Sequence, residues 1–173
     1  AERVYEILDQ ENTIVNKKDA LKISNLKKSI NFIIKSFKYE NKNVLQNINF
    51  TIKKGQKVAL VGHSGGGKTT LADLLPRFYD LEDGEINIDN INIKDVDLFN
   101  LRNIISIVSQ DSILFNDSIY NNIKIGNLNA TKEDIINAAK AANAHEFILK
   151  CEDSYQTNIG NSGEKLSGGQ KQR

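Results

Sequence analysis

The chain has no tryptophan and no methionine, and it contains one cysteine and one proline among 173 residues. Since Cys151 has no partner within the chain, an internal disulfide is excluded, which fits a reducing compartment. The chain also lacks a large excess of charge of either sign, because 23 basic and 22 acidic side chains give a net charge of +1. Any anion site must therefore be built locally.

Long apolar runs and metal-ligand clusters are missing too. No run approaches the roughly 18 residues that a membrane-spanning helix needs, and the charged N-terminal residues do not resemble a secretion signal. The two histidines and the cysteine lie far apart, which leaves no metal-ligand cluster and no catalytic triad. Because there is no initiating methionine, and because the end GGQKQR has no helix stop, we expect a piece cut at both ends.

Hydrophobic periodicity divides the chain into a sheet-rich part and a helix-rich part, with a change near Asp111. Residues 1–10 predict a short helix, and the polar stretch that follows predicts a linker up to residue 29. Segments 30–39 and 44–52 predict an antiparallel hairpin, and residues 84–93 a second strand group. The almost wholly apolar runs QKVALVG and IISIVSQ predict strands buried in the middle of a sheet.

Five helices are expected in addition to the N-terminal one. Helical spacing from Leu71 to Phe78 predicts a helix that Pro76 shortens, and residues 97–103 and 117–123 predict two short ones. Residues 131–150 predict a long helix, with Thr131 and Asp134 placed as a capping pair. The final residues, LSGGQKQR, open a further helix.

The motif that carries the chemistry is GHSGGGKT, which has the spacing G-x-x-x-x-G-K-T. It follows an apolar run and precedes an amphipathic helix, the context that a phosphate-binding loop requires. Lys68 is expected to contact the terminal phosphates, and the Thr69 hydroxyl to bind Mg²⁺. His63 occupies an unconstrained position, so we expect a solvent-facing loop residue and not a general base. The predicted phosphate-loop residues are Gly62, His63, Ser64, Gly65, Gly66, Gly67, Lys68, Thr69 and Thr70.

Two further segments, taken together with this loop, resemble motifs of a known protein family. LSGGQ at residues 166–170 and ISIVSQDSILFNDSIYNNI resemble the signature sequence and the Q-loop region of the nucleotide-binding domain of ATP-binding cassette (ABC) exporters. FKYENKNVLQNINFTIKKGQKVALVG matches the family's approach to the phosphate loop, and AERVYEILDQ resembles the exporter linker. The resemblance covers the chain from about residue 30 to its end.

The resemblance implies roles for residues outside the loop. Tyr39 would stack on adenine, and Gln110 would contact Mg²⁺ and sense the γ-phosphate, so Lys68 and Gln110 are the catalytic candidates and Thr69 and Gln110 the metal candidates. In LSGGQ, Ser167 and Gln170 form a helix-capping pattern whose first turn lies open for an anion. The family places Ser167, Gly168, Gly169 and Gln170 against an ATP bound to the opposite subunit.

The sequence departs from the family pattern at a few positions. Gly66 and Thr69 stand where exporters more often have serine, which leaves the amide donors and the hydroxyl in place. TNIGNSGEK resembles the exporter loop that touches the membrane domain of the other subunit, and Asn161 stands where that loop usually has an acidic residue, so the resemblance does not extend to the charge used for coupling there. The second acidic motif, the catalytic glutamate and the switch histidine are not found, so residues 1–173 alone are expected to bind ATP weakly without hydrolysis.

The expected fold is α/β: a phosphate-loop NTPase core of the ABC type with an antiparallel β subdomain and an α-helical signature subdomain. Residues 1–29 would be a linker after a transmembrane domain, residues 30–110 the core and β subdomain, and residues 111–173 the helical subdomain. The expected function is the ATP-driven motor of an exporter of a lipid or hydrophobic compound, at the cytoplasmic face of a membrane. Its partners would be a second nucleotide-binding domain, head to tail, and a transmembrane domain, with no nucleic acid.

Two alternatives remain open. One is a degenerate or incomplete nucleotide-binding fragment without hydrolysis, and the other is a soluble ABC-type ATPase that works on nucleic acid or ribosomes. The second would predict basic patches or coiled-coil insertions between the phosphate loop and the signature. The balanced charge and compact spacing argue against it.

Overall fold

The structure is a computed structural model that describes residues 5, 9–10, 12–40, 42–110 and 112–173, so the helix predicted for residues 1–10 lies mostly outside the described residues. The chain forms two compact units, residues 1–106 and 107–173. The first contains β1 (Ser29–Tyr39), β2 (Lys42–Lys53), α2 (Lys68–Leu74), β3 (Asp83–Ile88), β4 (Ile91–Asn92), a 3₁₀ turn η1 (Ile93–Asp95) and α3 (Leu98–Asn103). The second contains α4 (Ile119–Lys124), α5 (Lys132–Ala141), α6 (His145–Ile148), the 3₁₀ turns η2 (Ser154–Gln156) and η3 (Asn161–Gly163), and α7 (Gly168–Gln172).

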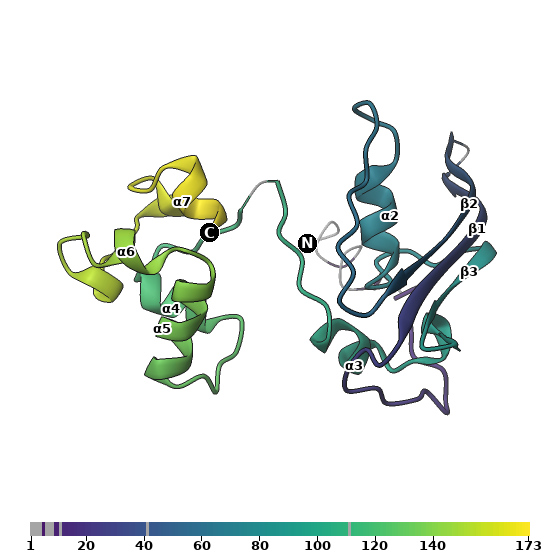
Figure 1. Cartoon of the computed structure of the whole chain (residues 1–173), viewed down its shortest axis with the longest axis horizontal. Helices are drawn as coiled ribbons and strands as arrows, with labels where there is room; N and C mark the ends of the chain where they lie inside the picture. Colours follow the sequence, from purple (N-terminus) through teal and green to yellow (C-terminus); the bar gives the residue numbers. More distant parts are fainter. Residues whose placement is uncertain (1–4, 6–8, 11, 41, 111) are drawn as a thin grey trace. The chain divides into compact units, whose positions relative to one another are not determined.

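The first unit is built on an antiparallel sheet with the strand order β2-β1-β3-β4 (Figure 1). β1 pairs with β2 from Ser29 opposite Lys53 to Tyr39 opposite Lys42, with a register shift between Phe37 and Lys38. The other edge of β1 pairs with β3. The predicted hairpin and the predicted strand group at residues 84–93 are both confirmed.

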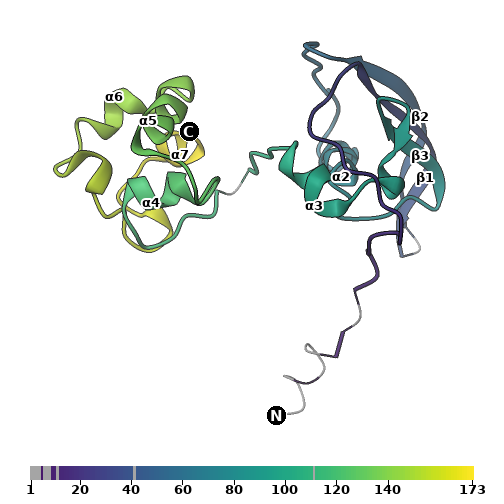
Figure 2. The same cartoon turned by 90° about the horizontal axis from the view of Figure 1, so that it is seen from below.

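One face of this sheet packs against α2, as Figures 1 and 2 both show. Apolar and polar residues alternate along β2, so that Ile48, Phe50 and Ile52 are partly buried while the residues between them are exposed. Period-two alternation sends one set of side chains to the core and the other to water. The core of this unit joins both elements through Phe32, Ile34, Ile86 and Ile88 from the strands and Leu71 and Leu74 from α2.

The apolar runs at 56–62 and 104–110 are not strands in the structure, so the prediction of two central buried strands is wrong. Val61 is 94% exposed and Val108 is 73% exposed. A strand needs a neighbour to satisfy its backbone groups. In the part of the chain that the structure describes, neither run pairs with a strand. The apolar composition of the two runs indicates that they could be buried. It does not indicate whether a partner strand is present.

The predicted helices of the first unit are found with shorter bounds. The helix expected from Leu71 ends at Leu74, two residues before Pro76, which cannot continue a helix. The segment after it turns through Arg77, whose φ is 54°. α3 begins directly after Asp97, whose side chain accepts the N–H of Asn100 and so caps the helix.

The second unit is helical around its own apolar core, which includes Ile119, Ile135, Ile148 and Ile159. The expected capping box forms at the start of α5, where the Thr131 and Asp134 side chains each bond the other's backbone. The long helix predicted for residues 131–150 is two helices. Asn143 adopts a left-handed conformation (φ 55°), and the N–H of Ala144 reaches back to the carbonyl of Ala139 at 2.7 Å. An asparagine in this conformation ends a helix as glycine does.

Candidate functional site

The predicted phosphate loop leads directly into α2, whose first residue is Lys68. Gly67 precedes the helix with φ 80°, and a Cβ atom there would lie 2.6 Å from a methyl carbon of Leu45 and 3.1 Å from the carbonyl oxygen of Val44. Both the dihedral angle and the close approach to β2 require glycine. The loop is therefore seated on the sheet at its helical end while Gly62 to Gly66 remain exposed.

Lys68 closes this loop. Its ammonium donates to the carbonyl oxygen of Gly62 at 3.0 Å and to that of His63 at 2.7 Å. The side chain of Lys68 is only partly buried, so the charge stays accessible from solvent. No acidic residue lies in the first turn of α2, and Gly67 has no side chain to cap it. A positive charge and the positive end of a helix therefore share one exposed loop, which suits an anion.

The remaining loop residues fall into exposed and buried sets. Ser64 and Thr69 are exposed, and the Thr69 hydroxyl lies on the first turn beside Lys68. Thr70 is buried and accepts a long hydrogen bond of 3.4 Å from the Tyr39 hydroxyl. His63 is exposed, as expected, and contributes its carbonyl oxygen, which also accepts the N–H of Gly66 at 3.2 Å.

Tyr39 belongs to an aromatic cluster at the end of β1. Its ring makes edge contacts with Phe37 at 5.0 Å and with Tyr79 at 4.9 Å between centroids. The adjacent Tyr39 raises the pKa of Tyr79 above its usual 10.0, and partial burial adds to this shift. Sequence reasoning singled out Tyr39 and missed Tyr79, because no local pattern links two residues that lie 40 positions apart in the chain. Phe37 is buried, Tyr39 is partly buried and Tyr79 is exposed, so the cluster presents an aromatic surface beside the start of α2.

The structure assigns the candidate residues to two units. Tyr39 and the loop from Gly62 to Thr70 lie in the first unit, whereas Gln110 and the residues of LSGGQ lie in the second. Gln110 is exposed at a bend that follows residues 105–109, which have no regular secondary structure. It therefore does not end a strand, contrary to the sequence expectation for its local structure.

The signature residues form the predicted capped helix. The Ser167 hydroxyl accepts the N–H of Gln170 at 3.3 Å, and the Gln170 side chain accepts the N–H of Ser167 at 2.9 Å. A Cβ atom on Gly168 or Gly169 would meet nothing within 4 Å. Neither glycine has a positive φ, so the chain itself does not require glycine at either position.

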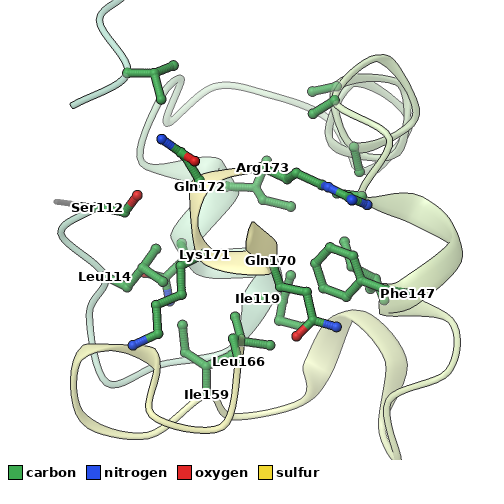
Figure 3. Close-up of a pocket in the computed structure, with 18 of the residues that line it drawn as sticks. Ser112, Leu114, Ile119, Phe147, Ile159, Leu166, Gln170, Lys171, Gln172 and Arg173 are labelled. Carbon is green, nitrogen blue, oxygen red and sulfur yellow. The ribbon is translucent and has the colours of Figure 1, made fainter. Parts of the chain in front are cut away.

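Beside this helix, the second unit contains a pocket of about 570 Å³ that sequence reasoning did not predict (Figure 3). Ile119, Phe147, Ile159 and Leu166 supply apolar walls, and residues 170–173 form one side. The walls come from several elements that are distant in sequence, which is why no local pattern signalled the pocket.

Comparisons with known proteins agree with these features. Residues 45–173 match a family model described as ABC transporter. The ATP-dependent lipid A-core flippase of Syntrophus aciditrophicus (strain SB) is 49% identical over 173 residues, which is 100% of this chain and 29% of that protein. A Bacillus subtilis (strain 168) protein with the provisional name multidrug export ATP-binding/permease protein YgaD is 46% identical over 174 residues, covering 99% of this chain and 30% of that protein.

A solved structure is similar over nearly the whole chain. It is a bacterial Atm1-family ABC exporter with ATP bound, with a TM-score of 0.91 and 37% sequence identity over 98% of this chain and 30% of that chain. The chain thus spans less than a third of the length of these relatives. Within the described residues, none of the helices has the length and apolar character needed to cross a membrane.

Proposed function

This chain belongs to the ABC transporter family, and from that premise we propose that it is the ATP-binding motor domain of an exporter. The observation that carries the proposal is the loop closed by Lys68, whose ammonium bonds the carbonyls of Gly62 and His63 at the start of α2. Two carbonyl oxygens are weak partners for a full positive charge. Negatively charged phosphate oxygens would replace them with a stronger interaction between opposite charges.

The surroundings of the loop fit ATP. Residues Gly62 to Gly66 are exposed to solvent, and the Thr69 hydroxyl is an oxygen ligand of the kind that Mg²⁺ accepts. The aromatic surface of Tyr39 would take the adenine ring. By the family resemblance, Gln110 would contact the metal and sense the γ-phosphate. Mg²⁺ would supply charge neutralisation on the phosphates, while this chain holds the nucleotide in place.

The partners follow from the same proposal. The open first turn of α7, with Ser167, Gly168, Gly169 and Gln170, would meet an ATP held by a second nucleotide-binding domain, giving a head-to-tail dimer. Residues 1–29 would connect residues 30–173 to a transmembrane domain, in the same or a partner chain, at the cytoplasmic face of a membrane. The relatives named for lipid A-core and multidrug export support a lipid or hydrophobic cargo.

The decisive experiment measures ATP hydrolysis and cargo movement by the whole protein that contains this chain, reconstituted in lipid vesicles. Replacing Lys68 by alanine should lower turnover by about 100-fold or more, because it removes the charge that holds the phosphates. Lys140→Ala removes an exposed lysine of α5 and serves as the matched control. Turnover that survives Lys68→Ala would refute the proposal.

Residues 1–173 alone should bind a fluorescent ATP analogue in a Lys68-dependent way and show no turnover. Binding requires only the loop, α2 and the aromatic cluster, all of which are formed in the first unit. Hydrolysis also needs a positioned general base, which the family motifs found in this sequence do not provide. Lys68-dependent turnover by residues 1–173 would overturn this part of the proposal.

A further inference from the structure

Two segments of the second unit, distant in sequence, are joined by backbone pairing. The N–H of Ile119 donates to the carbonyl of Thr157 at 3.1 Å, and the N–H of Ile159 donates to the carbonyl of Asp117 at 3.1 Å. These bonds flank an antiparallel bridge between Ser118 and Asn158. The segment that follows Gln110 is thereby fastened to the loop that precedes the signature.

Side chains extend this pairing to the turn η3. The Asn116 amide donates to the side-chain oxygen of Asn161 at 2.9 Å, at the first residue of η3. Within that turn Ser162 has φ 50° and Gly163 has φ 66°. A serine in the left-handed region is unfavourable unless its surroundings hold it there. The Asn116–Asn161 pair is one of the contacts that hold this turn.

The other side of the turn is held from α7. The Lys171 ammonium donates to the carbonyl oxygen of Ser162 at 2.8 Å, and the N–H of Leu166 donates to the carbonyl of Gly163 at 2.9 Å. Figure 3 shows the Lys171 side chain leaving α7 and running toward the loop ahead of it. The turn is therefore fixed between the segment after Gln110 and the helix that opens with Ser167.

We propose that Asn116, Asn161 and Lys171 are positioning residues that set the start of α7 relative to the segment after Gln110. The proposal rests on the proposed function, in which the first turn of α7 meets a nucleotide. Asn161 stands where an acidic residue is usual in exporters, and here its side-chain oxygen serves inside the chain as an acceptor for Asn116. Loosening η3 would misplace the capping box of Ser167 and Gln170 without touching the phosphate loop.

An exchange of amides for carboxylates tests the Asn116–Asn161 pair. In Asn161→Asp the Asn116 amide still donates to a carboxylate, and in Asn116→Asp the Asn161 amide can rotate and donate instead. The double variant places two carboxylates against each other with no donor between them. We expect each single variant to hydrolyse ATP within about 2-fold of the unmodified protein and the double variant to lose roughly 5-fold in kcat, with KM for ATP unchanged.

Hydrogen exchange provides a readout that does not depend on catalysis. In the whole protein, the amides of α7 should exchange roughly 5-fold faster in the double variant and in Lys171→Ala. Asn137→Ala and Lys140→Ala remove exposed residues of α5 and should leave both readouts unchanged. Additive effects of the two aspartates, or α7 exchange that none of these variants changes, would overturn the positioning role of Asn116, Asn161 and Lys171 even if Lys68-dependent hydrolysis holds. If hydrolysis does not depend on Lys68 but α7 exchange still follows the variants, only the proposed function fails.

Discussion

Asn16 joins the N-terminal segment to the cap of α3 through Asp97. The Asn16 amide donates to one carboxylate oxygen of Asp97 at 2.6 Å, and its own oxygen accepts the N–H of Leu98 at 2.7 Å. The other Asp97 oxygen accepts the N–H of Asn100 at 2.9 Å. Backbone bonds of Leu21 with the carbonyl of Asp95 and the N–H of Asp97 lie alongside. A segment that the sequence presents as a polar linker is therefore docked on the start of a helix.

Asn16→Ala should loosen α3. It removes two hydrogen bonds, one of them charge-assisted, and leaves the cap at Asn100 in place, so we expect a loss of about 1 kcal/mol in local stability. Asp97→Ala should cost more, about 2 kcal/mol, because the helix cap is lost as well. The measurement is hydrogen exchange at the amides of α3, with Asn25→Ala as the control at an exposed site in the same segment. Equal hydrogen exchange of the α3 amides in Asn16→Ala and in the unmodified chain would show that the contacts of Asn16 do not stabilise α3.

A second attachment of the same segment depends on pH. The Asp89 carboxylate accepts the backbone N–H groups of Lys27, Lys28 and Ser29 at 2.7, 2.6 and 3.0 Å. Partial burial pushes the pKa of Asp89 upward, but these backbone hydrogen bonds outweigh it, and the pKa lies below the usual 3.8. A depressed pKa in the folded state gives stability that is present above the unfolded value and is lost as the pH falls through the folded value.

The difference in urea midpoint between the unmodified chain and Asp89→Asn should therefore shrink on acidification. Asparagine cannot ionise, so the variant lacks the contribution at every pH, and the two proteins should begin to converge below about pH 4 and become equal once the pH has fallen below the folded pKa of Asp89. Urea unfolding at a series of pH values from 6 to below 3 provides the measurement. A midpoint difference that stays constant across that range would contradict the role given to the Asp89 charge.

Local features of this fold could be predicted from sequence, whereas long-range pairing could not. The β1–β2 hairpin, the helix after Gly67 and the caps at Thr131 and Ser167 depend on neighbouring residues, so the patterns located them correctly. The run QKVALVG has the same apolar character as a buried strand, but strand formation depends on a partner that composition does not reveal.

The same limit applies to the site. The spacing of GHSGGGKT predicted a loop followed directly by a helix, and the structure begins that helix at Lys68, three residues before the expected start at Leu71. The bond between Asn16 and Asp97 spans 81 residues, and that between Asn116 and Asn161 spans 45, with no motif to link them. The break after α5 at Asn143 could have been predicted in part. Asparagine readily adopts the left-handed conformation that ends a helix, but the sequence alone did not show that Asn143 adopts it.

Arg77 is the charged side chain on which the segment after α2 depends. It is 3% exposed, and its guanidinium makes two bonds to the Asp80 carboxylate, at 2.9 and 3.0 Å. The backbone carbonyl of Arg77 in turn accepts a hydrogen bond from the Arg102 guanidinium at 3.0 Å. Arg77→Ala should destabilise the first unit by about 3 kcal/mol, because it leaves a cavity and an unpaired carboxylate. Arg77→Lys should cost about half of that, since an ammonium cannot make the paired contact. Urea unfolding checks both, and a stable Arg77→Ala variant would contradict the assignment.

Gly67 and Gly168 should respond in opposite ways to alanine. At Gly67 the added Cβ would lie 2.6 Å from Leu45 in a backbone with φ 80°, so Gly67→Ala should destabilise the first unit by about 2 kcal/mol and weaken ATP binding. At Gly168 nothing lies within 4 Å and φ is not positive, so Gly168→Ala should leave stability unchanged or slightly higher.

The same Gly168→Ala change should still impair the whole protein. If the open first turn of α7 is kept clear for a nucleotide held by a second domain, a methyl group there blocks the approach, and ATP turnover should fall by about 10-fold or more. Unfolding midpoints, ATP affinity and turnover measured on both variants separate the two cases. A Gly168→Ala protein that is stable and fully active would show that the open space at α7 has no role in turnover, while the folding argument for Gly67 would stand.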